Sequence, residues 1–134
     1  DNSSFPPRDS IYSIIETNDQ KYLVSAGEDK MIRVWDKNTW ECIKTLSGHE
    51  HYVHSIVETK DERYIISGGT DGTIKIWDKK KWECVHTIGK YGNKNPEKSH
   101  VGWINIAIES VEGKNIISAG DDKIIRIWGI PGEE

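Results

Sequence analysis

A twelve-residue motif that occurs three times constrains the fold of this chain more than any other feature. Each copy begins with serine, has aspartate four residues later and tryptophan six residues after that. The first two tryptophans are 42 residues apart (77 − 35) and the next two 51 apart (128 − 77). Such a period indicates one supersecondary unit per repeat, stacked on its neighbours. The copies read SAGEDKMIRVWD (25–36), SGGTDGTIKIWD (67–78) and SAGDDKIIRIWG (118–129).

Each unit is predicted to consist of β-strands. Short runs rich in Ile and Val alternate with turn residues such as Asp71-Gly72, which is the usual signature of strands and hairpins. No segment has apolar residues at the 3.6-residue period of a helix, so we expect no long helix. We therefore predict an all-β chain with units at about residues 10–46, 52–88 and 103–130.

These residues resemble the WD-repeat (Trp-Asp repeat) family over nearly the whole chain. Gly48-His49 precedes the first strand of the second unit, and Trp35-Asp36 and Trp77-Asp78 are the family's Trp-Asp endings. The third unit departs from the pattern with Trp128-Gly129. The resemblance implies a β-propeller built from four-stranded antiparallel blades. Residues 1–134 would then form an open arc of three blades.

The repeated His, Ser and Asp have two interpretations. They are the residue types of a hydrolase triad, but two identical triads in adjacent units are hard to explain as catalysis. The resemblance implies instead a hydrogen-bonded chain of His, Ser, Asp and Trp that ties the strands of one blade, with matching donors and acceptors. In the first unit, Pro7 stands in the place of the histidine. The expected network comprises Ser25, Asp29, Trp35, His49, Ser67, Asp71, Trp77, His100, Ser118, Asp122 and Trp128.

Charge and composition argue against several classes of protein. The formal net charge is −4 and the 18 Lys and Arg residues are scattered, whereas nucleic-acid binding needs a basic surface. No apolar run approaches the roughly 18 residues that span a membrane. His49, His51 and His54 give no complete set of zinc ligands, so we expect no metal and no cofactor. The lysine run 79–81 is expected to be a solvated turn.

The two cysteines, Cys42 and Cys84, hold the same place in two different repeats. Two cysteines are too few for a disulfide scaffold or a zinc site made of cysteine alone. We expect both to be buried thiols that behave as small apolar side chains. This predicts a reducing, cytoplasmic location.

An arc of three blades would expose an apolar face at each end, which soluble monomers rarely do. Closed propellers have about 4–8 blades. The chain is therefore expected either to be part of a longer propeller, since it starts at Asp1 and its only methionine is Met31, or to close a ring with copies of itself. We favour a head-to-tail homo-oligomer of two or three copies. By resemblance, the N-terminal segment 1–9 would supply the last strand of the third blade.

The resemblance implies a non-catalytic interaction scaffold that binds proteins or peptides on its loop face. Trp103 and Tyr52 are favoured contacts because aromatic residues are enriched at binding hot spots; the alternative is that they pack against the neighbouring blade. The insertion 90–99, with three lysines, would suit an acidic partner. Two rival functions are a sensor or assembly module of a larger signalling protein and a hydrolase. The candidate contact residues are Ser10, Glu28, Tyr52, Thr70, Trp103 and Asp121.

Overall fold

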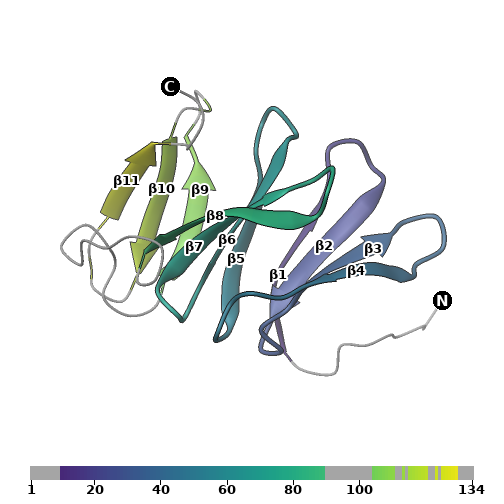
Figure 1. Ribbon diagram of the computed structural model, residues 1–134, viewed down its shortest axis with the longest axis horizontal. Helices are drawn as coiled ribbons and strands as arrows, with labels where there is room; N and C mark the ends of the chain where they lie inside the picture. Colours follow the sequence, from purple (N-terminus) through teal and green to yellow (C-terminus); the bar gives the residue numbers. More distant parts are fainter. Residues whose placement is uncertain are drawn as a thin grey trace.

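The structure is a computed structural model, and it describes residues 10–89, 104–110, 113, 115–120, 123 and 125–129. Within these residues the chain forms eleven strands, arranged as three antiparallel sheets that we call the first, second and third blades (Figure 1). The first blade comprises β1 (Ile11–Glu16), β2 (Tyr22–Gly27), β3 (Ile32–Asp36) and β4 (Cys42–Leu46). The second comprises β5 (Val53–Glu58), β6 (Tyr64–Gly69), β7 (Thr73–Asp78) and β8 (Glu83–Gly89). The third comprises β9 (Ile104–Glu109), β10 (Asn115–Gly120) and β11 (Ile125–Gly129).

Each blade is a meander in which every strand pairs with the next one along the chain. The turn between the second and third strands has the same backbone conformation in all three blades. The residue after the hairpin aspartate has a left-handed φ, at 69° for Lys30, 76° for Gly72 and 64° for Lys123. Glycine adopts this conformation without a steric penalty, whereas lysine does not. The turn is therefore fixed by the fold, and only the second blade uses the residue best suited to it.

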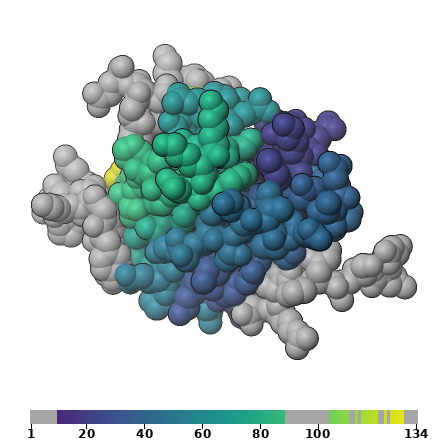
Figure 2. Space-filling view, turned by 45° about the vertical axis from the view of Figure 1, so that its right-hand side comes forward, coloured from purple at the N-terminus to yellow at the C-terminus, as the bar shows by residue number. Residues whose placement is uncertain are grey.

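The blades pack face to face, and the apolar core lies between them. One buried cluster joins the first blade to the second, and a second cluster joins the second blade to the third. Figure 2 shows the blue atoms of the first blade in contact with the teal and green atoms of the second. The innermost strands are also joined by serine. The Ser13 Oγ accepts the Ile56 N–H at 3.1 Å, and the Ser55 Oγ accepts the Ala107 N–H at 3.1 Å.

The three blades form an open arc, with β1–β4 at one end and β9–β11 at the other (Figure 1). The prediction of an all-β fold with propeller-type blades is confirmed. In the part of the chain that the structure describes, the third sheet has three strands in the order β11-β10-β9. The predicted donor of a fourth strand, segment 1–9, lies outside the described residues, as does the insertion 90–99.

The prediction that Cys42 and Cys84 are buried is wrong, because both are exposed. They lie in or next to the outermost strands β4 and β8, where the rim of each blade meets solvent. Each thiol donates to the backbone carbonyl two residues further on, at 3.3 Å to Lys44 and 3.3 Å to His86. The predicted reducing compartment rested on buried thiols, so it loses that support, and the cytoplasmic location stays a prediction.

Candidate functional site

The most elaborate polar site lies inside the second blade, where the side chains of four residues meet. We call these residues the tetrad: His49, Ser67, Asp71 and Trp77. The His49 Nε2 lies 2.7 Å from the Ser67 Oγ, and the His49 Nδ1 lies 3.0 Å from the Asp71 Oδ2. The indole N–H of Trp77 donates to the same Ser67 Oγ at 2.9 Å. A single hydroxyl thus links the loop before β5 to strands β6 and β7.

Asp71 anchors this chain of hydrogen bonds. Besides His49, its carboxylate accepts the Thr73 hydroxyl at 2.7 Å, the Thr73 N–H at 3.0 Å and the Glu50 N–H at 3.0 Å. Burial by itself would raise the pKa of the Asp71 carboxyl. The hydrogen bond and charge of His49, together with the donors of Thr73 and Glu50, outweigh that effect and hold this pKa well below its usual range.

The burial of the tetrad bears directly on the hydrolase interpretation. A catalytic serine must reach a substrate carbonyl, but Ser67 is fully buried and the His49 side chain is inaccessible to solvent. The Ser67 hydroxyl also has Trp77 and His49 as neighbours on two sides. In this conformation the geometry suits a brace between strands and gives a substrate no route to the hydroxyl.

The first and third blades repeat part of this arrangement. The Trp35 indole donates to Ser25 at 2.9 Å, and the Trp128 indole donates to Ser118 at 2.9 Å. In the first blade Asp29 has an arginine in place of a histidine: its carboxylate accepts the Arg33 Nε–H at 3.0 Å. Four of the predicted site residues, His100, Trp103, Asp121 and Asp122, lie outside the described residues.

Four of the predicted contact residues lie together in pairs where the loops before β1 and β5 meet the hairpin turns. The Glu28 N–H donates to the Ser10 carbonyl at 2.9 Å, and the Thr70 N–H donates to the Tyr52 carbonyl at 2.8 Å. We call the surface that carries these pairs the turn face. The same backbone contact therefore builds the turn face in the first and second blades.

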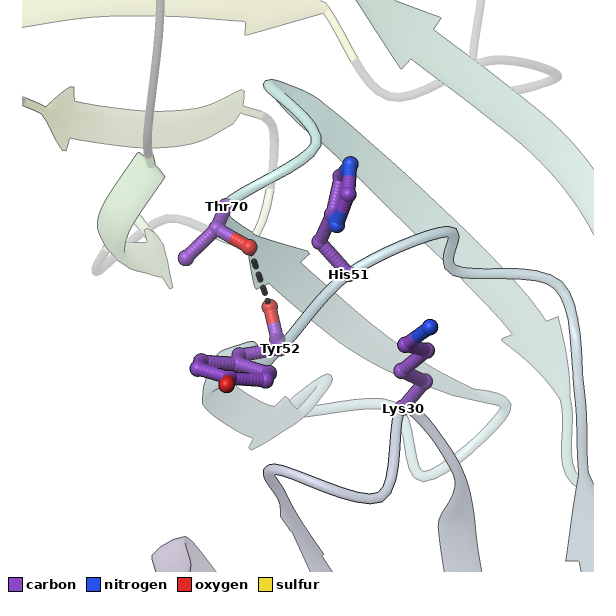
Figure 3. A pocket seen from close by; sticks show the side chains of 4 residues that line it. All are labelled: Lys30, His51, Tyr52 and Thr70. Carbon is purple, nitrogen blue, oxygen red and sulfur yellow. Dashed lines mark hydrogen bonds between the residues drawn. The ribbon is translucent and has the colours of Figure 1, made fainter.

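The turn face is hollowed between the first and second blades. A pocket of about 450 Å³ is lined by Lys30 from the β2–β3 turn, His51 and Tyr52 before β5, and Thr70 from the β6–β7 hairpin (Figure 3). This volume lies within the usual range for ligand pockets. Sequence reasoning missed Lys30 and His51, although each is adjacent in sequence to a residue already singled out.

The Glu28 carboxylate near this pocket already accepts a hydrogen bond from an aromatic residue of the first blade. The Tyr12 hydroxyl donates to the Glu28 carboxylate at 2.7 Å, and this hydrogen bond raises the pKa of Tyr12. The Tyr12 ring also stacks on His54 of the second blade, with ring centroids 4.8 Å apart. Tyr12 therefore bridges the two blades beside the pocket.

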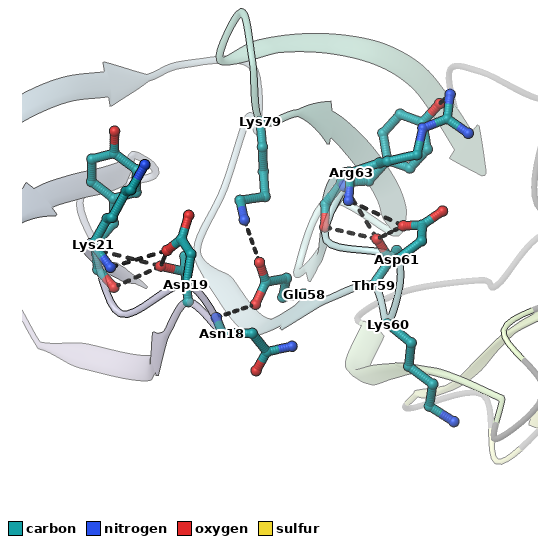
Figure 4. A network of polar contacts seen from close by, with 12 residues as sticks. Asn18, Asp19, Lys21, Glu58, Thr59, Lys60, Asp61, Arg63 and Lys79 are labelled. Carbon is teal, nitrogen blue, oxygen red and sulfur yellow. Dashed lines mark hydrogen bonds and ion pairs between the residues drawn. The ribbon is translucent and has the colours of Figure 1, made fainter.

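The opposite face carries a buried ion pair that contradicts the expectation of a solvated lysine turn. Lys79 forms an ion pair with Glu58, and the two side chains are only 9% and 5% exposed. The second Glu58 oxygen accepts the Asn18 N–H of the first blade at 2.8 Å (Figure 4). Lys80 and Lys81 are exposed, as expected. Lys79 differs because it reaches back to a carboxylate that the neighbouring blade covers.

A family model described as "WD domain, G-beta repeat" matches residues 3–36, 40–78 and 82–129. The chain belongs to the WD40 repeat family. WD40 repeats generally mediate protein–protein interaction, and the family is generally non-catalytic. Membership therefore supports an interaction scaffold, in agreement with the buried position of the tetrad.

Several curated proteins match short parts of the chain. A probable coatomer subunit beta' of Schizosaccharomyces pombe is 46% identical over 35 residues, which cover 26% of this chain and 4% of that protein. The nuclear distribution protein PAC1 of Arthroderma otae is 52% identical over 31 residues, which cover 23% of this chain and 7% of that protein. A p21-activated protein kinase-interacting protein 1-like of Danio rerio is 38% identical over 45 residues, which cover 34% of this chain and 12% of that protein. Each match spans a small fraction of the relative's length.

Within the described residues of this WD40 chain, no helix is long and apolar enough to cross a membrane. Among the same residues there is no group of three or more His, Cys, Asp or Glu side chains placed to hold a metal ion. Of the two histidines close in sequence to His49, His51 lines the pocket and His54 stacks on Tyr12.

Proposed function

We propose that the chain is a non-catalytic interaction scaffold that binds protein or peptide partners on the turn face. The observation that carries this proposal is the pocket between the first and second blades, lined by Lys30, His51, Tyr52 and Thr70. It combines an exposed aromatic ring with several hydrogen-bond donors, which is the composition expected of a binding hot spot. The WD40 family supports the same class of function.

The chemistry of the pocket favours an acidic partner segment. Lys30 supplies a positive charge, while the hydroxyls of Tyr52 and Thr70 and the ring nitrogens of His51 supply further polar groups. The nearest predicted acidic contact, Glu28, already accepts the Tyr12 hydroxyl. A carboxylate of a bound peptide would therefore meet donors. Trp103, Asp121 and the insertion 90–99 are proposed to extend this surface.

The remaining contact positions follow the same logic. Ser10 and Glu28 are proposed to present the equivalent surface of the first blade, since the Glu28 N–H bonds to Ser10 as Thr70 bonds to Tyr52. The tetrad residues are proposed to brace the blade that carries the pocket. No residue of this scaffold is assigned a catalytic role, and no cofactor is assigned to it.

The scaffold is further proposed to close into a ring of copies in the cytoplasm, with segment 1–9 supplying the fourth strand of a third blade. The open arc supports this, because both of its ends carry exposed apolar side chains. The rival proposal is a sensor or assembly module within a larger signalling protein. Its support is that the matched segments make up only 4–12% of much longer relatives.

A peptide-display selection on the immobilised chain tests the binding face. The dissociation constant of a selected peptide is measured by fluorescence anisotropy for the wild type and for Lys30→Glu, Tyr52→Ala and Trp103→Ala. We expect the selected peptide to be acidic. We expect Lys30→Glu to raise its dissociation constant roughly tenfold, since charge reversal replaces attraction by repulsion. Lys80→Glu is the matched control, because it makes the same charge change on the opposite face. Unchanged affinity in all three test variants would reject the turn face.

A further inference from the structure

The two interfaces inside the arc are built from equivalent positions. We call the side of a blade that packs on the preceding blade its receiving side, and the side that packs on the following blade its presenting side. The receiving side of the second blade contributes Val53, Ile56 and Ile65, and that of the third blade contributes the residues 51 positions further on. Those residues are Ile104, Ala107 and Ile116. The presenting side of the first blade contributes Val24, Ile32 and Val34, and the second blade contributes the residues 42 further on. Those residues are Ile66, Ile74 and Ile76.

The same positions are uncovered at the two ends of the arc. On the receiving side of the first blade, Ile14 is 60% exposed, whereas its counterpart Ile56 is 3% exposed. On the presenting side of the third blade, Ile125 is 72% exposed, whereas its counterpart Ile74 is completely buried. Each end of the arc is therefore half of an interface that the chain already forms twice.

A polar contact marks the receiving side in the same way. The Glu58 Oε1 accepts the Asn18 N–H from the preceding blade at 2.8 Å, and the Glu109 Oε1 accepts the Lys60 N–H from its preceding blade at 2.7 Å. Both donors lie in the turn that follows a first strand. Glu16 holds the equivalent position in the first blade and accepts Lys37 through its Oε2 at 2.5 Å. Among the described residues none donates to the Glu16 Oε1.

We propose that the receiving face of the first blade, with Ile14 at its centre and Glu16 at its edge, takes the presenting face of the third blade of a second copy. Glu16 then accepts a backbone N–H of the incoming blade, as Glu58 and Glu109 do from their preceding blades. This inference rests on the proposed ring and gives it a direction, since a head-to-tail contact is heterologous and propagates until it closes.

A second copy fits because this chain carries both halves of the interface. Two positions that join the internal interfaces are changed in the third blade. Ile106 stands where Ser13 and Ser55 bridge the internal interfaces, and Asn115 stands in the place of Tyr22 and Tyr64. The first change removes a hydrogen bond, and the second removes an aromatic contact. The assembly is therefore weaker than the internal packing and dissociates on dilution.

Sedimentation velocity on the full chain, over a range of concentrations, tests the proposal. The wild type is expected above the monomer mass of 15.3 kDa, and Ile14→Asp and Ile125→Asp are each expected to be monomeric. Both positions are exposed in the single chain, so far-UV circular dichroism should show retained folding. Mixing the two variants leaves one intact receiving face and one intact presenting face, so a 1:1 heterodimer should form.

Ile43→Asp is the matched control for an added charge. Ile43 is 41% exposed in the first blade, and its counterpart Val85 is 42% exposed although the second blade has a neighbour on both sides. The position thus faces solvent whether or not a blade follows, and Ile43→Asp should assemble as the wild type does. Glu16→Ala should raise the dissociation constant about tenfold, the effect of losing a hydrogen bond to a charged group.

The outcomes separate this inference from the proposed function. A wild type that is monomeric at every concentration overturns both the ring and the head-to-tail contact, but leaves peptide binding on the turn face unaffected. An oligomer that resists Ile14→Asp and Ile125→Asp overturns the head-to-tail contact alone. Variants that dissociate the oligomer but fail to pair when mixed also overturn it, because they indicate a symmetric contact.

Discussion

The Nε2 atom of His49 lies 2.7 Å from the Oγ of Ser67, although 18 residues separate them in the chain. The contact ties the loop before β5 to the second strand of its own blade. Because both side chains are buried, the hydrogen bond is shielded from water, and each side chain would lose a hydrogen-bond partner without the other.

Ser67→Ala is expected to lower the free energy of unfolding by about 2–3 kcal/mol, because it leaves buried nitrogen atoms of both His49 and Trp77 without this partner. The measurement is urea unfolding at a fixed protein concentration. Ser25→Ala is the matched variant in the first blade, where the indole of Trp35 loses its serine acceptor and we expect about 1 kcal/mol. Equal effects of the two substitutions would contradict a special bracing role for His49.

The stability of the protein is expected to fall in acid because of Asp71. Its pKa in the folded protein lies below the usual value of 3.8, so its contribution is fully present above that value. The contribution is lost as the pH falls through the lower, folded pKa. Asp19 and Asp61, whose pKa values are also lowered by their neighbouring threonines and backbone N–H groups, act in the same direction.

This pH dependence is checked by measuring the urea midpoint from pH 7 to pH 2. Asp71→Asn should be less stable than the wild type at pH 7 and should lose less stability below about pH 4. An Asp71→Asn variant whose midpoint falls in parallel with that of the wild type would show that other carboxylates govern the acid response.

Lys79→Met is expected to cost about 3–5 kcal/mol, because it leaves the buried Glu58 charge without its cation. Lys37→Met removes the equivalent cation beside Glu16, whose side chain is half exposed, and should cost at most about 1 kcal/mol. Chemical unfolding of the two variants under identical conditions makes the comparison. Similar losses for both would indicate that the Lys79 pair is solvated in solution.

Glu62→Gly is expected to stabilise the chain by about 0.5 kcal/mol. Glu62 has a φ of 63°, which costs a non-glycine residue roughly 1–2 kcal/mol, while glycine loses about 0.5–1 kcal/mol more backbone entropy on folding. The third blade already has Gly113 at this position, with a φ of 73°. The reverse substitution, Gly113→Ala, should destabilise, and thermal unfolding of both variants tests the pair.

Local pattern predicted the features that lie within a single repeat. The apolar runs and the turn residues predicted the strands, and the resemblance to the WD-repeat family implied that the serine and tryptophan side chains would share one blade. In antiparallel strands joined by short turns, residues ten apart such as Ser67 and Trp77 are brought together by the hairpin itself. No long-range information is needed to predict such a pair.

Other features were missed although the sequence held a signal for them. Glu16, Glu58 and Glu109 recur at the same 42- and 51-residue spacing as the tryptophans. In the second and third blades these glutamates accept a backbone N–H from the preceding blade. Their role was invisible because the partner is a main-chain group, which leaves no mark in the sequence. The exposure of Cys42 and Cys84 was mispredicted because their position in the repeat indicated a strand but not which side of it meets solvent.

The sequence by itself determined the repeat, its strands, the family and the residue types inside each blade, since these depend on neighbours a few residues away. Only the tertiary structure decided which copy of each position is buried. Ile14 and Ile56 hold the same place in two repeats, yet only Ile56 is covered, because another blade packs against it. Glu16 and Glu58 differ for the same reason. Burial is a property of what surrounds a residue, and in a stack of repeats the surroundings change at each end while the local sequence does not.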